Sequence, residues 1–345
     1  MIGCGGIGEY HLGHFLTYEN LMEMVGFCDL IPERAEKFVN KAGCGKAYTD
    51  FRVMLDETKP DMVFVCIPPY CHGEVEMELL SRGIHFFIEK PMTLDIEFAK
   101  KVRDAIDEKG LITGVGFQCR YNNFTDVTRE FCRNNQVVYV DCTRFGGVPQ
   151  VFWWRDKELS GGQLVETTIH QCDLLRYFVG DVVEVCSYNT SGFVTDTENF
   201  KTDDCSVTIA RFANGALATI GTGCYSRKGD SFHSKIVLSC AEKRVEYRLG
   251  KSAEIYGEKP AAKEEGEVVY AIKGDGALGA GGDKIVVERT NDPGIDCDRT
   301  FIEAVISGDG SKIRSPYRDA YKTLAFVLAA NESMATGKSV KVDLD

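Results

Sequence analysis

The sequence predicts an α/β protein in which a doubly wound parallel sheet precedes an α+β domain with a mainly antiparallel sheet. The length of 345 residues favours two domains over one compact core. Up to residue 118, short apolar runs alternate with amphipathic stretches, as strands and helices do around a parallel sheet. Beyond that point, strand-like runs follow one another without long helices, which indicates antiparallel pairing. We therefore expect domains at residues 1–118 and 119–345.

Apolar runs, and the Pro or Gly residues that end them, predict the strands and helices of the first domain. Residues 61–67 form a continuous apolar run that Pro68 and Pro69 end, as expected of a strand buried on both faces. Residues 32–42 carry apolar side chains on one helical face, and Gly43 follows as a stop. The predicted strands span residues 24–28, 61–67, 84–88 and 111–117, and the predicted helices run from the first glycine cluster to about residue 20 and over residues 32–42, 72–81 and 94–109.

The second domain reads as a series of strands with few helices. Asn214-Gly215 lies between two strand-like runs and is a strong hairpin signal. Residues 250–295 are charged and Gly-rich, so we expect a long peripheral excursion there. An amphipathic helix is predicted at residues 317–336, where Gly337 ends it, and we expect it to pack back towards the first domain. The other predicted helices span residues 123–134 and 166–179, and the strands span residues 137–145, 182–188, 204–212, 216–222, 235–239 and 245–249.

The composition of the chain excludes some classes of binding partner and indicates the cellular compartment. There are 40 Lys and Arg against 52 Asp and Glu, a net charge of −12, which argues against binding to nucleic acid or an anionic membrane surface. No apolar run approaches the roughly 20 residues that span a bilayer, and no signal peptide is evident at the start. The 14 cysteines contain no C-x-x-C pair, so we expect reduced thiols, no metal site and a cytoplasmic protein.

A glycine cluster near the start has the spacing of a dinucleotide-binding turn. Gly3, Gly5 and Gly8 follow the pattern G-x-G-x-x-G and open a helix, and Asp29 lies 21 residues after Gly8 at the end of the next strand. Glycines permit a tight turn and the approach of a pyrophosphate, and the acid accepts hydrogen bonds from the adenosine ribose. A glycine-rich turn without a ligand is the alternative.

Two details qualify this site. Asp29 is followed by Leu30 and not by an arginine, so the carboxylate would repel the 2′-phosphate of NADP, and NAD is favoured although Arg34 is close in sequence. The strand that should precede Gly3 is reduced to Met1 and Ile2, whereas strands usually have about 5–6 residues. We expect either that further residues precede Met1 or that the cofactor site is compromised, and we favour the first.

A second motif is Glu89-Lys90-Pro91 at the end of a predicted strand. Doubly wound folds bind ligands at the carboxyl ends of their strands, where a lysine can orient a hydroxyl, stabilise developing negative charge or relay a proton. A strand-end lysine in an ordinary salt bridge is the alternative. The same tripeptide at residues 258–260 lies in a charged stretch that no strand delivers to a sheet, so we expect a solvated loop there.

A third group is Glu166, His170 and Asp173, whose spacing places them roughly on one face of the predicted helix. A histidine beside a carboxylate is the usual arrangement of a general acid/base. A capped helix with a packed histidine is the alternative, although Gly161-Gly162 and two tryptophans nearby suggest the mouth of a pocket.

These motifs together resemble the glucose–fructose oxidoreductase / inositol dehydrogenase / MocA-like (Gfo/Idh/MocA) family. The markers are GCGGIG at 3–8, CIPPYCH at 66–72, IEKP at 88–91 and SGGQLVETTIHQCDLLRYFVG at 160–180, and the likeness covers nearly the whole chain but is weakest in 225–300. The resemblance implies an N-terminal Rossmann domain, a second domain with a large open sheet, a nicotinamide cofactor, and a homodimer or homotetramer formed through the open face of that sheet.

The resemblance also implies roles for individual residues. Lys90 would be the catalytic lysine and His170 the acid/base, and Glu166, which would act beside them, stands where members often have Asp. The residues that would hold the cofactor are Gly3, Gly5, Gly6, Ile7, Gly8, Asp29, Ile67, Pro68, His72, Glu89 and Lys90. The residues that would face the substrate are Lys90, Arg120, Tyr121, Trp153, Trp154, Arg155, Glu166 and His170, although ordinary packing or a surface salt bridge is an equal alternative for the five residues between 120 and 155.

The predicted function is reversible oxidation of a secondary alcohol on a sugar, cyclitol or glycoside by an NAD-dependent dehydrogenase. Lys90 and His170 are expected to converge on one carbon–oxygen bond. Two alternatives remain open: an enzyme of the same fold that retains NAD to cleave a glycoside or epimerise a centre, and a sensor of sugars or dinucleotides that has lost catalysis.

Overall fold

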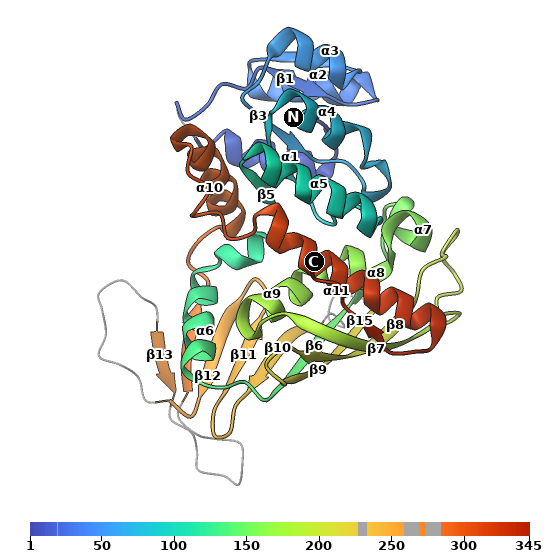
Figure 1. Cartoon of the computed structure of the whole chain (residues 1–345), viewed down its shortest axis with the longest axis vertical. Helices are drawn as coiled ribbons and strands as arrows, with labels where there is room; N and C mark the ends of the chain where they lie inside the picture. Colours follow the sequence, from blue (N-terminus) through green and yellow to red (C-terminus); the bar gives the residue numbers. More distant parts are fainter. Residues whose placement is uncertain (19, 227–232, 259–268, 273–283) are drawn as a thin grey trace. The chain divides into compact units, whose positions relative to one another are not determined.

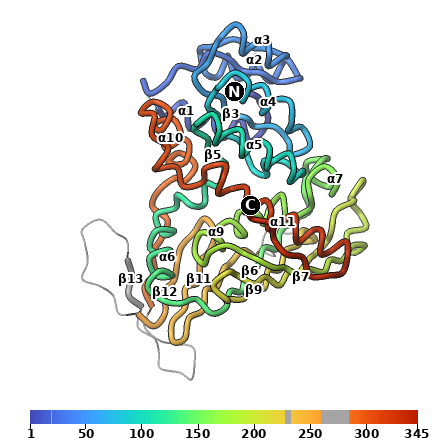
Figure 2. Tube along the Cα trace, in the orientation of Figure 1, coloured from blue at the N-terminus to red at the C-terminus, as the bar shows by residue number. Residues whose placement is uncertain are grey.

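The chain divides into two units. The computed structural model describes residues 1–18, 20–226, 233–258, 269–272 and 284–345. One unit comprises residues 1–118 and 293–321, and the other comprises residues 119–292 and 322–345. Residues 293–321, which the sequence analysis assigns to the second domain, belong to the first unit because Phe301 of α10 (Pro293–Ser307) packs edge-on against Phe64 and Phe87. Figures 1 and 2 show α10 beside α1 (Gly6–Phe15).

The first unit is built on parallel strands, as predicted. β1 pairs with β2, and β3, β4 and β5 form a second parallel group in that order. Ile2 joins the groups, since it bridges to Cys28 on one side and to Val65 on the other. The strands are β1 (Gly26–Cys28), β2 (Lys46–Tyr48), β3 (Met62–Val65), β4 (His85–Ile88) and β5 (Thr113–Val115), and the helices between them are α2 (Pro32–Ala42), α3 (Phe51–Thr58), α4 (Glu74–Arg82) and α5 (Ile96–Lys109).

β2 and α3 are not among the elements expected from the sequence, and the first helix is shorter than the expected run to about residue 20. α3 begins because the Asp50 carboxylate accepts hydrogen bonds from the backbone N–H groups of Arg52 and Val53 and so caps the helix. α1 ends at Phe15, and the C-cap Leu16 donates its N–H to the carbonyl of Leu12.

The first strand consists of very few residues but is paired on both sides. The N–H of Ile2 donates to Phe64 and its carbonyl accepts from Cys66, while the N–H of Gly3 donates to Cys28. The terminal ammonium of Met1 donates to the carbonyl of Gly26 at 2.8 Å, and its burial lowers the pKa of the amine. A cavity of about 1000 Å³ opens beside Met1, lined by residues of β1 and β3 and by their preceding segments.

The second unit contains a ten-stranded sheet in the order β13-β14-β12-β11-β10-β6-β9-β8-β7-β15. Neighbouring strands are antiparallel except β6 and β9, which are parallel, so the sheet is mixed and mostly antiparallel. The strands are β6 (Tyr139–Gly147), β7 (Val182–Thr190), β8 (Cys205–Phe212), β9 (Leu217–Ser226), β10 (His233–Ser239), β11 (Arg244–Arg248), β12 (Ser252–Tyr256), β13 (Val269–Ile272), β14 (Lys284–Glu288) and β15 (Val340–Lys341).

Helices cover one face of this sheet. Tyr247 of β11 packs against Phe124 of α6 (Asn123–Asn134) and Phe178 of α9 (Ile169–Val179), which places both helices on that face (Figure 1). α11 (Tyr317–Thr336) spans the division between the units, with its first five residues in the first unit and the remainder in the second. Asn214 and Gly215 form the turn between antiparallel β8 and β9, as predicted.

Two sequence-based predictions in this unit are wrong. Residues 250–295 are not simply a peripheral excursion, because β12 and β14 are paired strands of the sheet. Glu254 interrupts the apolar pattern of β12, which is why the sequence does not predict this strand. Its buried carboxylate pairs with Lys284 at 2.7 Å and with Arg248 at 3.1 Å. Most of the rest of that segment, including Lys259 and Pro260, lies outside the described residues.

The second error concerns the predicted helix at residues 166–179. It is interrupted, since α8 (Gly162–Glu166) ends before Thr167 and α9 begins after Thr168. The hydroxyl of Thr168 bonds to that of Thr222 on β9 at 2.5 Å, and the two β-branched residues are stiff at χ1. Glu166 and His170 therefore lie on different helices. Across the described ranges, no helix combines the length and apolar character required to cross a membrane.

Candidate active site

The glycine-rich turn has little room at two of its glycines and open space at a third. Gly3 has φ +94°, and a Cβ there would lie 2.3 Å from the carbonyl oxygen of Cys66. A Cβ on Gly8 would lie 2.4 Å from the carbonyl oxygen of Gly3. A Cβ on Gly5 or Gly6 would meet nothing within 4 Å, so the turn is tightly packed against the sheet and open at the start of α1. An anion such as a pyrophosphate fits this open helix N-terminus.

Asp29 is attached to the same turn. Its Oδ2 accepts the backbone N–H of Cys4 at 2.9 Å, and its Oδ1 accepts that of Ile31 at 2.9 Å. Each carboxylate oxygen can accept another hydrogen bond, and the side chain remains partly accessible beside the turn. The guanidinium of Arg34 is 3.9 Å from Oδ1 and half exposed. The turn and the acid thus meet as the sequence predicts.

The segment after β3 adds a buried pair of hydrogen-bonded side chains. Ile67 contacts the turn, since its side chain lies 3.2 Å from a Cβ built on Gly3, and Pro68 follows it. His72 Nδ1 is 2.6 Å from Glu76 Oε1, and the N–H of Gly73 donates to Oε2. Burial alone would raise the pKa of Glu76, but the His72 ring and this N–H outweigh burial and lower the pKa. Nε2 of His72 is buried without a partner among the described residues, so a bound ligand could supply one.

Glu89 and Lys90 lie at the carboxyl end of β4. The Glu89 carboxylate is buried, with Oε1 3.1 Å from His11 Nε2 and Oε2 accepting the N–H of Lys90 at 3.2 Å. A Cβ on Gly116 would lie 2.1 Å from Oε1, so this glycine makes room for the carboxylate. The contacts described for Glu89 are therefore with protein groups, whereas Lys90 is half-buried at the edge where the turn lies.

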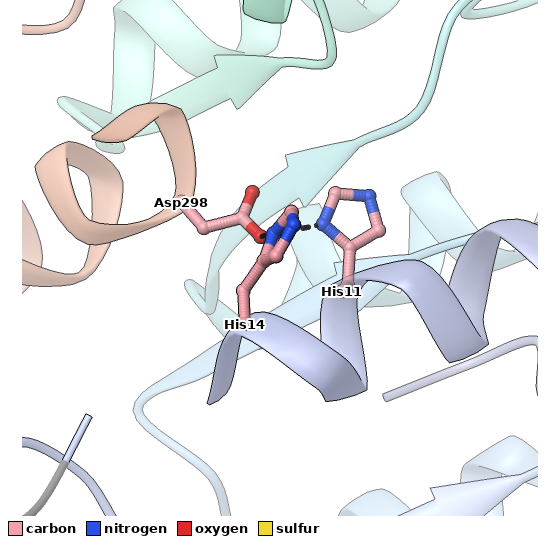
Figure 3. A group of neighbouring side chains, drawn as sticks. All are labelled: His11, His14 and Asp298. Carbon is pink, nitrogen blue, oxygen red and sulfur yellow. Dashed lines mark hydrogen bonds and ion pairs between the residues drawn. The ribbon is translucent and has the colours of Figure 1, made fainter. Parts of the chain in front are cut away.

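Sequence reasoning missed a group around His11. Nδ1 of His11 and Nδ1 of His14, both on α1, each lie 2.7 Å from Oδ2 of Asp298 on α10 (Figure 3). The three atoms lie within 4.8 Å of one another, which is compatible with metal ligation. The spacing of the two histidines is visible in the sequence, but Asp298 is 287 residues from His11 and nothing in the sequence connects them.

In the second unit, Asp173 binds a buried arginine and a threonine. Arg120 donates from Nε and Nη2 to the two oxygens of Asp173 at 2.7 and 2.6 Å, and the hydroxyl of Thr323 donates to Oδ1 at 3.0 Å. All three side chains are buried. His170 and Asp173 lie three residues apart on α9, whereas Glu166 lies on α8, so the prediction of one helix for all three residues is wrong. The placement of Arg120 fits packing better than substrate contact.

The aromatic segment forms a compact local structure. Trp153 and Trp154 stack with ring centroids 5.9 Å apart, and Arg155 donates to the carbonyls of Pro149 and Gln150. Trp154 lines a cavity of about 210 Å³ together with Arg144 and Gln163. Tyr121 is buried near Arg120, while Glu166 is buried at the end of α8 and His170 is half-buried in the first turn of α9. Lys90 belongs to the first unit and His170 to the second, so their convergence stays a prediction.

The fold and this site define the class of two-domain, dinucleotide-dependent oxidoreductases. Residues 1–117 match the model of the oxidoreductase family with an NAD-binding Rossmann fold, and residues 134–342 match that of the family's C-terminal alpha/beta domain. The chain belongs to this family, Gfo/Idh/MocA.

Several characterised proteins are similar to this chain. The myo-inositol 2-dehydrogenase of Thermotoga maritima is 25% identical over 348 residues, which cover 99% of this chain and 98% of that protein. The scyllo-inositol 2-dehydrogenase (NAD(+)) of Bacillus subtilis is 26% identical over 244 residues, 69% of this chain and 70% of that protein. Among solved structures, levoglucosan dehydrogenase in complex with NADH and levoglucosan superposes with a TM-score of 0.83 at 18% identity, covering 100% of this chain and 98% of that one.

Proposed function

We propose that this protein is an NAD-dependent dehydrogenase that oxidises a secondary alcohol of a sugar, cyclitol or glycoside. The observation that carries the proposal is the joint placement of Gly3, Asp29 and Lys90 at one edge of the parallel sheet, with open space at Gly5 for a pyrophosphate. The names of the similar dehydrogenases, which act on inositols and levoglucosan, support a polyhydroxylated substrate.

NAD supplies the hydride acceptor when it is bound. Gly3, Gly5 and Gly8 shape the turn that receives the pyrophosphate, and Gly6 and Ile7 begin the helix whose N–H groups face it. The carboxylate of Asp29 would accept hydrogen bonds from the ribose hydroxyls and would repel a 2′-phosphate, which favours NAD over NADP. The predicted cofactor contacts of Ile67, Pro68, His72, Glu89 and Lys90 belong to this proposal as well, although Glu89 is better supported as a partner of Lys90 and His11.

The chain's own residues carry the proton chemistry. His170 takes the proton of the reacting hydroxyl, and the ammonium of Lys90 stabilises the negative charge that develops on the same oxygen. Glu166 is proposed to orient His170 or a substrate hydroxyl, and Tyr121, Trp153 and Arg155 remain proposed substrate contacts.

The test measures NADH formation over a panel of inositols, hexoses and glycosides with the wild type, Lys90→Ala and His170→Ala. We expect each variant to lose at least about 100-fold in kcat, in line with the usual contribution of a general acid/base. Lys101→Ala, which removes an exposed lysine on α5, is the matched control and should retain full activity. Wild-type rates in both active-site variants would refute the mechanism. NAD that copurifies and turns over without NADH release would favour glycoside cleavage or epimerisation instead.

We also propose a homo-oligomer formed by the open face of the ten-stranded sheet. Side chains of β8 alternate, and Val207 and Ile209 are about half exposed at 48% and 52%. Register places exposed Tyr188 beside Val207, and exposed Leu217 and Tyr139 beside each other on the same face. Exposed apolar side chains that gather on one face are typical of an interface, and the same face of a second copy of the chain can pack against it. Ile209→Glu should shift the mass measured by light scattering towards the monomer, whereas Ile306→Glu on α10 should not.

A cytoplasmic location is proposed from the thiols. All 14 cysteines lie in the described part of the chain as free thiols, and a reducing compartment preserves that state. Titration of the denatured protein without reductant should find all of them reactive when it is purified from the cytoplasm.

A further inference from the structure

The proposed mechanism gives no role to one buried cluster of charged side chains, in which the carboxylates of Asp298 and Glu89 lie on either side of His11. His11 is 2% exposed, and both of its ring nitrogens face a carboxylate oxygen: Nδ1 faces Asp298 at 2.7 Å and Nε2 faces Glu89 at 3.1 Å. A carboxylate can only accept hydrogen bonds. Both contacts are therefore hydrogen bonds only if both ring nitrogens carry protons, which makes His11 an imidazolium.

Electrostatics agree with this protonation state. Burial alone would lower the pKa of His11, but the two facing carboxylates, Asp298 before Glu89, outweigh burial and raise the pKa to about 10. The cation also reduces the cost of burying two acids side by side. His14 contributes a further hydrogen bond to Asp298 and does not reach Glu89.

The contacts of Glu89 continue this chain of interactions to the predicted catalytic lysine. Oε1 bonds to His11 and Oε2 accepts the backbone N–H of Lys90 at 3.2 Å, so the carboxylate links the ring to the peptide between positions 89 and 90. The N–H of Glu89 donates to the carbonyl of Val65, which holds the preceding peptide, between positions 88 and 89, against β3. Gly116 leaves the space that the carboxylate occupies.

His11 also lies on the helix that begins at the glycine-rich turn. One side chain thus connects the turn that receives the pyrophosphate with the strand end that carries Lys90. We propose that His11 is a positioning residue, which as an imidazolium between Asp298 and Glu89 holds the Glu89–Lys90 peptide, and hence the Lys90 ammonium, in register with the dinucleotide turn. The inference rests on the proposed function, in which Lys90 acts at the substrate oxygen.

The matched pair of variants is His11→Gln and His14→Gln, because both residues lie on α1 and bond to Asp298 but only His11 bonds to Glu89. We expect His11→Gln to lower kcat by about 10-fold to 100-fold, as a catalytic group displaced by an ångström does. The KM for NAD should change less than about threefold. His14→Gln should keep kcat within about threefold of the wild type. Equal losses of kcat in the two variants would show a purely structural role and overturn the proposal.

A double-mutant cycle tests the route through Glu89. If His11 acts through this carboxylate, the losses of kcat in His11→Gln and Glu89→Gln should not add, whereas those in His14→Gln and Glu89→Gln should. Additive losses in the first cycle would overturn the proposal.

A measurement that needs no substrate separates this inference from the proposed function. The rate at which an amine-reactive acetylating reagent labels Lys90, followed by peptide mass spectrometry, should change at least threefold in His11→Gln and not in His14→Gln. An unchanged rate would overturn the positioning role even if the protein is an active dehydrogenase. A changed rate in a protein that oxidises no alcohol would refute only the function.

The metal content of the protein provides a further test. One zinc or other transition-metal ion per chain in the purified protein, lost in His14→Gln, would overturn the proposal. The ring nitrogens facing Asp298 would then be ligands and not hydrogen-bond donors.

Discussion

The two ends of the parallel sheet in the first unit differ sharply in how completely they are packed. At the carboxyl end, Cβ atoms on Gly3, Gly8 or Gly116 would lie within 2.4 Å of neighbouring atoms, and Asp29 and Glu89 are hydrogen-bonded in place. At the amino end, a cavity of about 1000 Å³ lies beside Met1. The comparison teaches that pairing of Ile2 on both sides is sufficient to position the turn, although the opposite end of the same layer is not filled by side chains.

The largest effect is expected where the packed end is overfilled. Gly3→Ala places a Cβ 2.3 Å from the Cys66 carbonyl oxygen at φ +94°, so both overpacking and backbone strain oppose it. We expect a loss of about 3 kcal/mol in the free energy of unfolding, and loss of NAD binding by titration calorimetry. Gly13→Ala, in the middle of α1 with nothing within 4 Å, is the control and should stabilise by about 0.8 kcal/mol. Comparable stability of the two variants in urea unfolding would contradict the comparison.

A smaller effect is expected where the open end is filled. A four-residue apolar strand such as Val-Val-Val-Ile, placed directly before Met1, can pair with β1 and β3 and occupy the cavity. We expect about 2 kcal/mol of added stability from burial of one or two side chains, with the Kd for NAD changed less than about twofold. A Gly-Ser extension of equal length should add nothing. A gain in NAD affinity as large as the gain in stability would show that the two ends are not independent.

The smallest effect, taken per pH unit, follows from the titration of His11. Its pKa in the folded state is raised to about 10 from an ordinary value near 6.5, so its stabilising contribution is complete below about pH 6.5 and is lost as the pH rises towards 10. The stability should therefore fall by up to about 1.4 kcal/mol per pH unit between pH 7 and 10, measured by urea unfolding. The groups facing the ring are Asp298, Glu89, His14 and Tyr10, and Cys66 lies near both carboxylates. A His11→Gln variant should show a flatter profile, and an identical slope would assign the effect to another group.

Local signals determine much of the site in the first unit. Gly3, Gly8 and Asp29 are recognisable because a turn, a helix start and a strand end are each short-range patterns, and the chain brings them together without distant help. Glu89 and Lys90 follow from one apolar strand and its end. The interruption between α8 and α9 was not predicted, and Thr168 at this break bonds to Thr222, which lies on a strand 54 residues further along the chain.

The sequence by itself determined the two-domain organisation, the parallel strands of the first unit and the dinucleotide turn, because each rests on periodicity or on backbone geometry that neighbouring residues specify. Only the tertiary structure decided which charges meet. The pairing of Arg120 with Asp173 and the bridge from Asp298 through His11 to Glu89 join residues 53 to 287 positions apart. The physical reason is that a buried charge is stable only when a counter-charge lies within hydrogen-bonding distance. The fold can bring that partner from any position in the chain, so the spacing of residues in the sequence does not reveal the pair.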